Sequence, residues 1–211
     1  MTSVERSVYK VVETFVSING EGAKSGSLAL FIRFQGCNLH CDYCDTEWAN
    51  RDDTPYTEWT DDEIIDLVRE SKVKNVTLTG GEPLIQKDID KLIDRLITET
   101  DCRIEIETNG TISIEKWDGY YNNLSFTLDY KLPGSGVPHF VHTKNYGYLS
   151  EEDTVKFVCS NEEDLDVARE VIEKYCSFMP VPIFLTNEDE EPKTEEIPEE
   201  EVTEKDRQES V

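Results

Sequence analysis

Segments typical of β-strands alternate with amphipathic helical segments through most of this chain of 211 residues. A capping box at residues 60–63 predicts one helix, apolar residues spaced three and four apart over 89–97 predict a second, and Asn161 begins a third that runs to about Lys174. The strand-like segments cover residues 10–18, 27–34, 73–79, 103–108, 124–130, 154–159 and 181–185. Because strands joined by helices form parallel βαβ units, we expect an α/β domain, specifically an open, partial (β/α)6-type barrel of mainly parallel strands.

Polar or glycine-rich residues stand at the carboxyl ends of four of these strands. A cysteine-rich loop follows strand 27–34, and Thr-Gly-Gly-Glu-Pro follows from the end of strand 73–79. Thr-Asn-Gly closes strand 103–108, and Asp-Tyr-Lys ends strand 124–130. Ligands of parallel α/β folds bind at the carboxyl ends of the strands. The four segments are therefore predicted to surround one cavity.

The cysteine-rich loop contains Cys37, Cys41 and Cys44, in the spacing C-x3-C-x2-C. Four thiolates would complete a metal site, whereas three leave one iron of a 4Fe–4S cluster without a protein ligand, as a centre that binds a substrate requires. A zinc loop that recruits His40, or three unrelated core cysteines, are the alternatives, and the spacing favours the cluster. The other cysteines are expected to be small buried residues: Cys102, Cys159 and Cys176.

The charge of the chain is strongly acidic, with a formal net value of −25. Such a chain lacks the basic stripe of a protein that binds nucleic acid directly. Residues 188–211 hold twelve Asp or Glu, three Lys or Arg and no aromatic residue. A segment of this composition buries too little apolar surface to offset its ordering entropy. We therefore predict a folded domain over residues 1–187 and a disordered acidic tail over 188–211.

The opening residues carry charges of both signs without an apolar segment, and no apolar run is long enough to span a bilayer. Clustered cysteines in such a chain indicate a reducing compartment. We therefore expect a cytoplasmic protein that has no membrane partner.

Several motifs, most of them in the first 50 residues, resemble a known family. The cysteine loop, with Tyr43 before its last cysteine and Gly-Gly-Glu after the next strand, resembles the radical S-adenosylmethionine (SAM) superfamily. Residues 17–22 (SINGEG), 31–37 (FIRFQGC) and 44–46 (CDT) are similar to the 7-carboxy-7-deazaguanine synthase family. The similarity runs from about residue 11 to about residue 174.

The resemblance implies a reaction and its cofactors. Members of the family contract 6-carboxy-5,6,7,8-tetrahydropterin to 7-carboxy-7-deazaguanine and release ammonia, on the way to queuosine and related deazapurines. A 4Fe–4S cluster, SAM and Mg2+ are the implied cofactors, and the methionine part of SAM chelates the open iron. Electron transfer to SAM produces a 5′-deoxyadenosyl radical, which starts the reaction by taking hydrogen from C6 of the substrate. The implied partners are a reductant such as flavodoxin or ferredoxin and a second copy in a homodimer.

The resemblance also implies roles for individual residues. Cys37, Cys41 and Cys44 would bind the cluster, and Thr46 would bind Mg2+, while no side chain is expected to carry the chemistry itself. The residues expected to face SAM are Tyr43, Cys44, Asp45, Gly80, Gly81, Glu82, Asn109, Asp129, Tyr130 and Lys131. The residues expected to face the substrate are Ile18, Asn19, Gly20, Glu21, Arg33 and Thr79. Arg33 matches the guanidinium that holds the substrate carboxylate, a role suited to a bidentate group.

Plainer structural interpretations stand beside four of these roles. Arg33 would be a surface ion-pair residue, Glu21 and Asn109 would be turn residues, and Thr46 would cap the next segment. At the level of function, the alternatives are another radical SAM protein, such as an activase of glycyl-radical enzymes, or a catalytically impaired iron–sulfur protein that acts through its acidic tail. Beyond Lys174 the similarity ends and the chain passes through residues 180–185 into that tail, which suggests a more open pocket, a tail that acts as a lid, or impaired activity.

Overall fold

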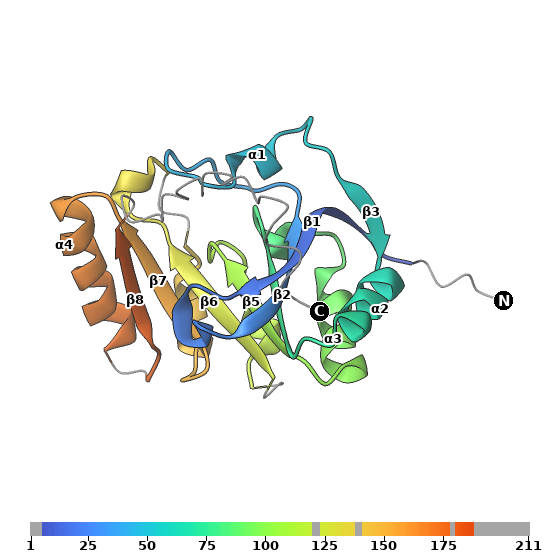
Figure 1. Cartoon of the computed structure of the whole chain (residues 1–211). Coiled ribbons are helices and arrows are strands. Elements are labelled where there is room, and N and C mark those ends of the chain that lie inside the picture. Colours follow the sequence, from blue (N-terminus) through green and yellow to red (C-terminus); the bar gives the residue numbers. More distant parts are fainter. Residues whose placement is uncertain (1–5, 120–122, 138–140, 178–179, 188–211) are drawn as a thin grey trace, which may run out of the picture.

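The computed structural model describes residues 6–119, 123–137, 141–177 and 180–187. Its centre is one sheet of eight strands in the order β3-β1-β2-β4-β5-β6-β7-β8 (Figure 1). The strands are β1 Val8–Ile18, β2 Leu28–Phe34, β3 Thr57–Thr60, β4 Asn75–Gly80, β5 Arg103–Thr108, β6 Leu124–Tyr130, β7 Thr154–Cys159 and β8 Ile183–Asn187. The predicted acidic tail, residues 188–211, lies outside the described residues, so the predicted domain boundary stays a prediction.

The pairing of the strands confirms the predicted fold class. From β2 through β4, β5, β6 and β7 to β8, every neighbouring pair is parallel, whereas β1 pairs antiparallel with both β2 and β3. The short edge strand β3 was not predicted. The last strand begins at Ile183 rather than at residue 181. Pro182 has no N–H to donate to a neighbouring strand, and only its carbonyl takes part, by accepting from the Val155 N–H.

The longer helices are α2 Asp61–Ser71, α3 Ile89–Glu99 and α4 Glu162–Val171, and α1 Glu47–Asn50 is a single turn. The predicted capping box is present, because the Thr60 hydroxyl accepts from the Glu63 N–H and the Glu63 carboxylate accepts from the Thr60 N–H. Asn161 caps α4 through the Asp164 N–H, and α4 continues as a π-helical turn, Ile172–Cys176, slightly beyond the predicted end. The 3-10 turns are η1 Gly22–Lys24, η2 Pro83–Ile85, η3 Glu115–Trp117, η4 Pro133–Ser135 and η5 Thr143–Tyr148.

The two faces of the sheet differ in chemistry. On the outer face, apolar side chains of the strands join those of α2, α3 and α4 in one hydrophobic core; the strand residues include Ile32, Leu78, Ile106, Leu128 and Phe157. The residues between these apolar positions point to the inner face of the sheet. There, residues that are paired across adjacent strands are polar: Arg33 with Thr79, Thr77 with Glu105, Glu107 with Thr127, and Asp129 with Lys156. Strands of parallel sheets are usually apolar on both faces. A polar inner face therefore indicates that it lines a functional cavity.

The segment between β2 and α1 crosses the carboxyl ends of the parallel strands (Figure 1). This segment contains the three clustered cysteines. The remaining cysteines are buried in the core, as predicted, and the Cys102 thiol donates to the Val73 carbonyl at 3.3 Å. In the part of the chain that the structure describes, none of the helices has the length and apolar character needed to cross a bilayer.

Candidate active site at the carboxyl ends of the strands

The cysteine loop presents three free thiols, on Cys37, Cys41 and Cys44, which are all partly exposed. The Leu39 N–H points at the Cys37 sulfur at 3.4 Å, and the Asn109 side-chain amide lies 3.8 Å from the same sulfur. Hydrogen bonds of this kind to ligand sulfurs temper the charge of an iron–sulfur cluster. Burial raises the pKa of the Cys37 and Cys41 thiols, so at neutral pH iron would have to displace their protons.

Three cysteines fit a 4Fe–4S cluster better than they fit a single metal ion. Within the described residues, no group of three or more His, Cys, Asp or Glu side chains is arranged to hold one ion. The thiolates of a cluster bind different iron atoms, whereas the ligands of zinc must converge on one point. The arrangement therefore gives no support to the zinc alternative with His40.

The cysteine loop is fixed to the Gly-Gly-Glu segment by backbone contacts. The Gly81 N–H donates to the Phe34 carbonyl at 3.3 Å, and the Glu82 N–H donates to the Gly36 carbonyl at 2.9 Å. A Cβ atom on Gly81 would lie only 2.1 Å from the Gly36 oxygen. Gly80 adopts a φ of 143°, which favours glycine, and a Cβ there would collide with Phe34. Both glycines are therefore required for this close approach.

Glu82 is fully buried and acts as an internal brace. Its carboxylate accepts hydrogen bonds from the Leu84 N–H at 2.9 Å, the Thr108 hydroxyl at 2.9 Å and the Asn109 N–H at 2.7 Å. Burial raises the pKa of this carboxyl to about 7. Glu82 thus joins the end of β4 to the end of β5. A direct contact between its carboxylate and SAM stays a prediction.

Asn109 is more than a turn residue. Besides approaching the Cys37 sulfur, its amide donates to the Asn38 side-chain oxygen at 3.0 Å. Its own oxygen accepts from the Thr111 N–H at 3.1 Å and the Thr111 hydroxyl at 2.7 Å. The carboxyl end of β5 is therefore in direct contact with the cysteine loop through Asn109, one of the residues predicted to face SAM.

The end of β6 holds an ion pair beneath Tyr43. The Lys131 ammonium lies 2.8 Å from the Asp129 carboxylate and 5.5 Å from the centre of the Tyr43 ring. Burial alone would lower the pKa of Lys131, but Asp129 raises it, so the lysine stays charged. Among the described residues, the Tyr43 hydroxyl and one Asp129 oxygen are buried without a hydrogen-bond partner. Because such atoms are costly unless a ligand pairs with them, they fit a polar cofactor such as SAM.

Tyr130 lies on the other face of the same strand. It packs against Phe157 in the outer core, with ring centres 5.6 Å apart. The alternation of a strand separates Tyr130 from its neighbours Asp129 and Lys131, which face inward. The Tyr130 side chain therefore belongs to the core, and a contact between residue 130 and SAM, which would have to come from its backbone, stays a prediction.

Arg33 and Thr46, the residues predicted to bind the substrate carboxylate and Mg2+, are neighbours. The Arg33 guanidinium pairs with Glu13 at 2.7 Å and donates to the Thr46 hydroxyl at 3.4 Å. That hydroxyl in turn donates to the Asp45 carboxylate at 2.8 Å. The Arg33 side chain is only 18% exposed, which argues against a surface ion pair. Thr46 precedes α1 but makes no side-chain capping bond, which argues against the capping role.

The loop after β1, residues 19–27, folds across the inner face of the sheet and forms the floor of the site. The Asn19 amide donates to the Glu105 carboxylate at 2.6 Å, and the Asn19 oxygen accepts from the Glu21 N–H at 3.0 Å. The Glu21 carboxylate pairs with Lys156 on β7. Glu21 is therefore more than a turn carboxylate, while the side chain of Asn19 makes one hydrogen bond through its amide and one through its oxygen within the protein. Gly20 follows Asn19 at the floor, and Ile18 is 65% exposed at its edge.

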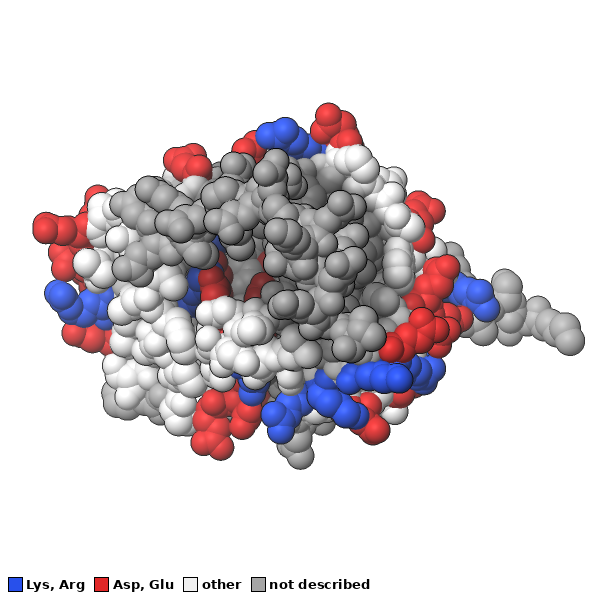
Figure 2. All heavy atoms as spheres, in the orientation of Figure 1, with Lys and Arg blue, Asp and Glu red and all other residues white. Residues whose placement is uncertain are grey.

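Two inner-face carboxylates were missed from the sequence. Glu107 accepts from the Thr79 hydroxyl at 2.7 Å, and burial raises its pKa to about 7. Glu105, one inner-face position earlier on β5, is buried and accepts from Asn19, Thr77 and Thr127. The signal was the alternation Arg-Ile-Glu-Ile-Glu-Thr, since charged residues at every second position of a central strand indicate a polar face. Figure 2 shows acidic and basic side chains inside a hollow near the centre of the face it views.

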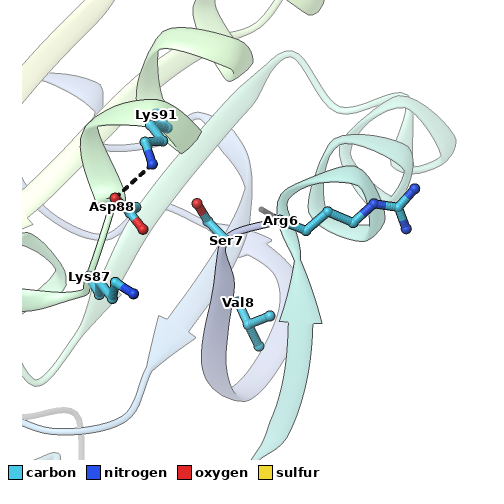
Figure 3. A pocket seen from close by; sticks show the side chains of 6 residues that line it. All are labelled: Arg6, Ser7, Val8, Lys87, Asp88 and Lys91. Carbon is cyan, nitrogen blue, oxygen red and sulfur yellow. Dashed lines mark ion pairs between the residues drawn. The ribbon is translucent and has the colours of Figure 1, made fainter. Parts of the chain in front are cut away.

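Two surface pockets lie elsewhere. One of about 260 Å³ is lined by Arg6, Ser7, Val8, Lys87, Asp88 and Lys91 and includes the Lys91–Asp88 ion pair (Figure 3). The other, of about 400 Å³, lies between the end of α2 and the start of β5. Neither contains any residue predicted to act at the site. The polar arrangement at the strand ends therefore carries the functional argument.

Comparison with known proteins agrees with this site. The model of the radical SAM superfamily matches residues 31–129. A 7-carboxy-7-deazaguanine synthase of Clostridium acetobutylicum is 53% identical over 167 residues, which cover 79% of this chain and 76% of that protein. The synthase of Methanospirillum hungatei JF-1 is 35% identical over 170 residues, covering 81% and 69% of the two chains.

Among solved structures, a crystal structure of QueE from Escherichia coli is similar, with a TM-score of 0.67 and 22% identity, over 85% of this chain and 84% of that one. At this identity, the structural likeness speaks for the fold. The identities with the two synthases over most of both chains speak for the family. The chain belongs to the radical SAM superfamily and, within it, to the 7-carboxy-7-deazaguanine synthase family.

Proposed function

We propose that this protein is a radical SAM carbon–nitrogen lyase that converts 6-carboxy-5,6,7,8-tetrahydropterin to 7-carboxy-7-deazaguanine with release of ammonia. Membership of the synthase family supports the reaction. The observation that carries the proposal is the contact between the Arg33 guanidinium and the Thr46 hydroxyl, directly beside the cysteine loop. An activase of glycyl-radical enzymes would share the cysteines but would give these two residues no role.

Residues at the carboxyl ends of the parallel strands offer ligands for the cluster and hydrogen-bond partners for SAM. Cys37, Cys41 and Cys44 would hold the cluster, and when bound the two cofactors supply the 5′-deoxyadenosyl radical that takes hydrogen from the substrate. Asn109 approaches one cluster ligand, and Glu82 fixes the backbone of Asn109. The unpaired oxygens of Tyr43 and Asp129 offer hydrogen bonds to SAM.

The substrate carboxylate has a cationic partner at the same place. The protein contacts of Arg33 use its Nε and one terminal nitrogen, and a guanidinium carries five N–H donors in all. Donors therefore remain for a carboxylate. Mg2+ seldom receives a full protein cage and keeps outside oxygen ligands. Thr46 would supply a protein oxygen to the Mg2+ ion, and the substrate carboxylate would supply further oxygen ligands.

The floor and the inner wall suit a ring rich in N–H groups. A pterin carries several hydrogen-bond donors, and the inner face offers the carboxylates of Glu107 and Glu21 as acceptors. With a pKa of about 7, Glu107 is able to hold or release a proton at neutral pH. Glu105 keeps Asn19 and the floor loop in place.

The remaining expectations concern the surroundings of the enzyme. A radical SAM enzyme consumes electrons, so we expect a reductant such as flavodoxin or ferredoxin. We also expect a homodimer in the cytoplasm. The test of the oligomeric state is light scattering of the purified protein.

The function is tested by anaerobic incubation with 6-carboxytetrahydropterin, SAM, Mg2+ and a reductant, followed by mass spectrometry. The expected product is 7-carboxy-7-deazaguanine, formed together with ammonia. Reactions without the pterin and reactions of a Cys41→Ala variant are the controls. SAM cleavage at the same rate with and without the pterin would favour another radical SAM activity. A protein that binds the cluster but never cleaves SAM would favour the impaired iron–sulfur protein.

A further inference from the structure

Asn50 lies between the cysteine loop and the Gly-Gly-Glu segment. It is the last residue of α1, and the carbonyl of the residue before it, Ala49, accepts from the Gly36 N–H at 3.4 Å. This contact ties the end of α1 to the start of the cysteine loop. From there, the Asn50 side-chain amide lies 3.7 Å from the Cys44 sulfur. Asn50 is therefore a hydrogen-bond donor to a residue expected to bind the cluster.

The other end of the same side chain is unpaired. Among the described residues, the Asn50 side-chain oxygen is buried without a hydrogen-bond partner. It faces Gly81 so closely that a Cβ atom there would be 2.2 Å away. An amide oxygen is an acceptor only, and a buried acceptor is expected to have a donor. A molecule that binds beside Gly81 and Cys44 would supply this missing donor.

Asn109 provides an internal comparison. Its amide also approaches a cysteine sulfur, but its oxygen is satisfied twice by Thr111. Two asparagines thus flank the cysteine loop, and only one has an acceptor left over. The difference is specific to the position of Asn50 and is not a general property of amides near the loop.

We propose that Asn50 links the cluster to SAM, with its amide donating to the Cys44 sulfur and its oxygen accepting from the α-amino group of SAM. The methionine part of SAM is the part that chelates the open iron, so its amino group comes close to the cluster ligands. An amino nitrogen bound to iron still carries two N–H bonds. The adenine and ribose donors are at the opposite end of the molecule. This inference uses family membership alone and does not depend on the pterin.

Two substitutions distinguish the role of the Asn50 amide nitrogen from the role of its oxygen. Asn50→Asp keeps an acceptor oxygen but loses the donor to Cys44, and it adds negative charge. We expect its cluster to have a more negative midpoint potential, because hydrogen bonds to cluster sulfurs favour the reduced form. Its affinity for SAM should stay within about threefold of the parent, since the acceptor is retained. Asn50→Leu loses both ends, and its dissociation constant for SAM should rise about tenfold.

The measurements are made on reconstituted, cluster-loaded protein without any pterin. Redox titration monitored by electron paramagnetic resonance gives the midpoint potential. Calorimetry gives the affinities for SAM and for 5′-methylthioadenosine, which lacks the amino acid part. Glu47→Ala, on the exposed side of α1, is the matched control and should change neither quantity. Iron and sulfide content reports whether each variant has kept its cluster.

An unchanged potential in Asn50→Asp would refute the donor role. Unchanged SAM affinity in Asn50→Leu, or equal weakening of SAM and 5′-methylthioadenosine, would refute the contact with the amino group. If Asn50→Leu fails to retain iron, Asn50→Ser takes its place in the same comparison. Because none of these readouts uses the pterin, they remain decisive even if the proposed substrate proves wrong.

Discussion

A single added methyl group at Gly81 should disable this site. In Gly81→Ala, the new Cβ would lie 2.1 Å from the Gly36 carbonyl oxygen, where real Cβ contacts are at least 3.0 Å. The Gly36 oxygen belongs to backbone that is hydrogen-bonded to Glu82, so it cannot rotate aside as a side chain would. The cysteine loop and the Gly-Gly-Glu segment must therefore separate by roughly 1 Å, as follows from the difference between these two distances.

The energetic and catalytic consequences follow from that displacement. Overpacking of this kind costs about 1–3 kcal/mol, and each kcal/mol lowers the melting temperature of a domain of this size by roughly 2–4 °C. A shift of about 1 Å between reacting groups costs on the order of 100-fold in rate. We therefore expect a folded protein with a melting temperature lower by about 2–12 °C, and turnover reduced by about 100-fold.

The assay compares Gly81→Ala with Gly147→Ala, because a Cβ on Gly147 meets nothing within 4 Å. Thermal unfolding of both variants is followed by circular dichroism, iron content is measured after reconstitution, and SAM cleavage is measured under anaerobic conditions. Gly147→Ala should match the parent in every measurement. If Gly81→Ala also matched the parent, the close backbone approach would not be a requirement of the site, and the reasoning would be wrong.

The other predictions concern the cluster, the substrate, the metal and pH. Cys37→Ala should abolish iron binding, whereas Cys159→Ala should retain it; equal losses on iron analysis would contradict the ligand assignment. Arg33→Lys should raise the KM for the pterin about tenfold without changing SAM binding, because an ammonium cannot reproduce a two-point contact; steady-state kinetics with each substrate varied will decide. Thr46→Ala should reduce the activation by Mg2+ at constant iron content, and an unchanged activity response to added Mg2+ would contradict the assignment of the metal to Thr46. The pKa of Glu107 is raised by burial to about 7 from an ordinary value of 4.5, so the folded state binds more protons between these values. The contribution of Glu107 to stability is therefore present below a pH of about 4.5 and should be lost, by about 3 kcal/mol, as the pH rises through about 7. Glu107→Gln should reduce the pH dependence seen in urea unfolding of the apoprotein, and the remainder belongs to Glu82, whose pKa burial also raises to about 7.

The local periodicity of the sequence determined the elements of the fold. The 3–4 spacing of apolar residues in α3 and the capping box at Thr60 and Glu63 are decided within a few residues of chain, and both were predicted correctly. The carboxyl-end rule for parallel strands likewise predicted that the cysteine loop, Gly-Gly-Glu and Thr-Asn-Gly segments would meet. Backbone hydrogen bonds now join the first two of these segments, and Glu82 joins the last two.

Tertiary structure alone decided which side chains share the cavity. Asn19 and Glu105 are 86 residues apart in sequence, and only the folding of the floor loop over the inner face brings them within 2.6 Å. Tyr130 lies in a motif predicted at the site, yet the alternation of β6 places it in the core. Asn50 carried no signal in the sequence, because its role arises where α1 ends against Gly81. The inward or outward direction of a side chain depends on strand register and on where helices pack, and both are properties of contacts distant in sequence.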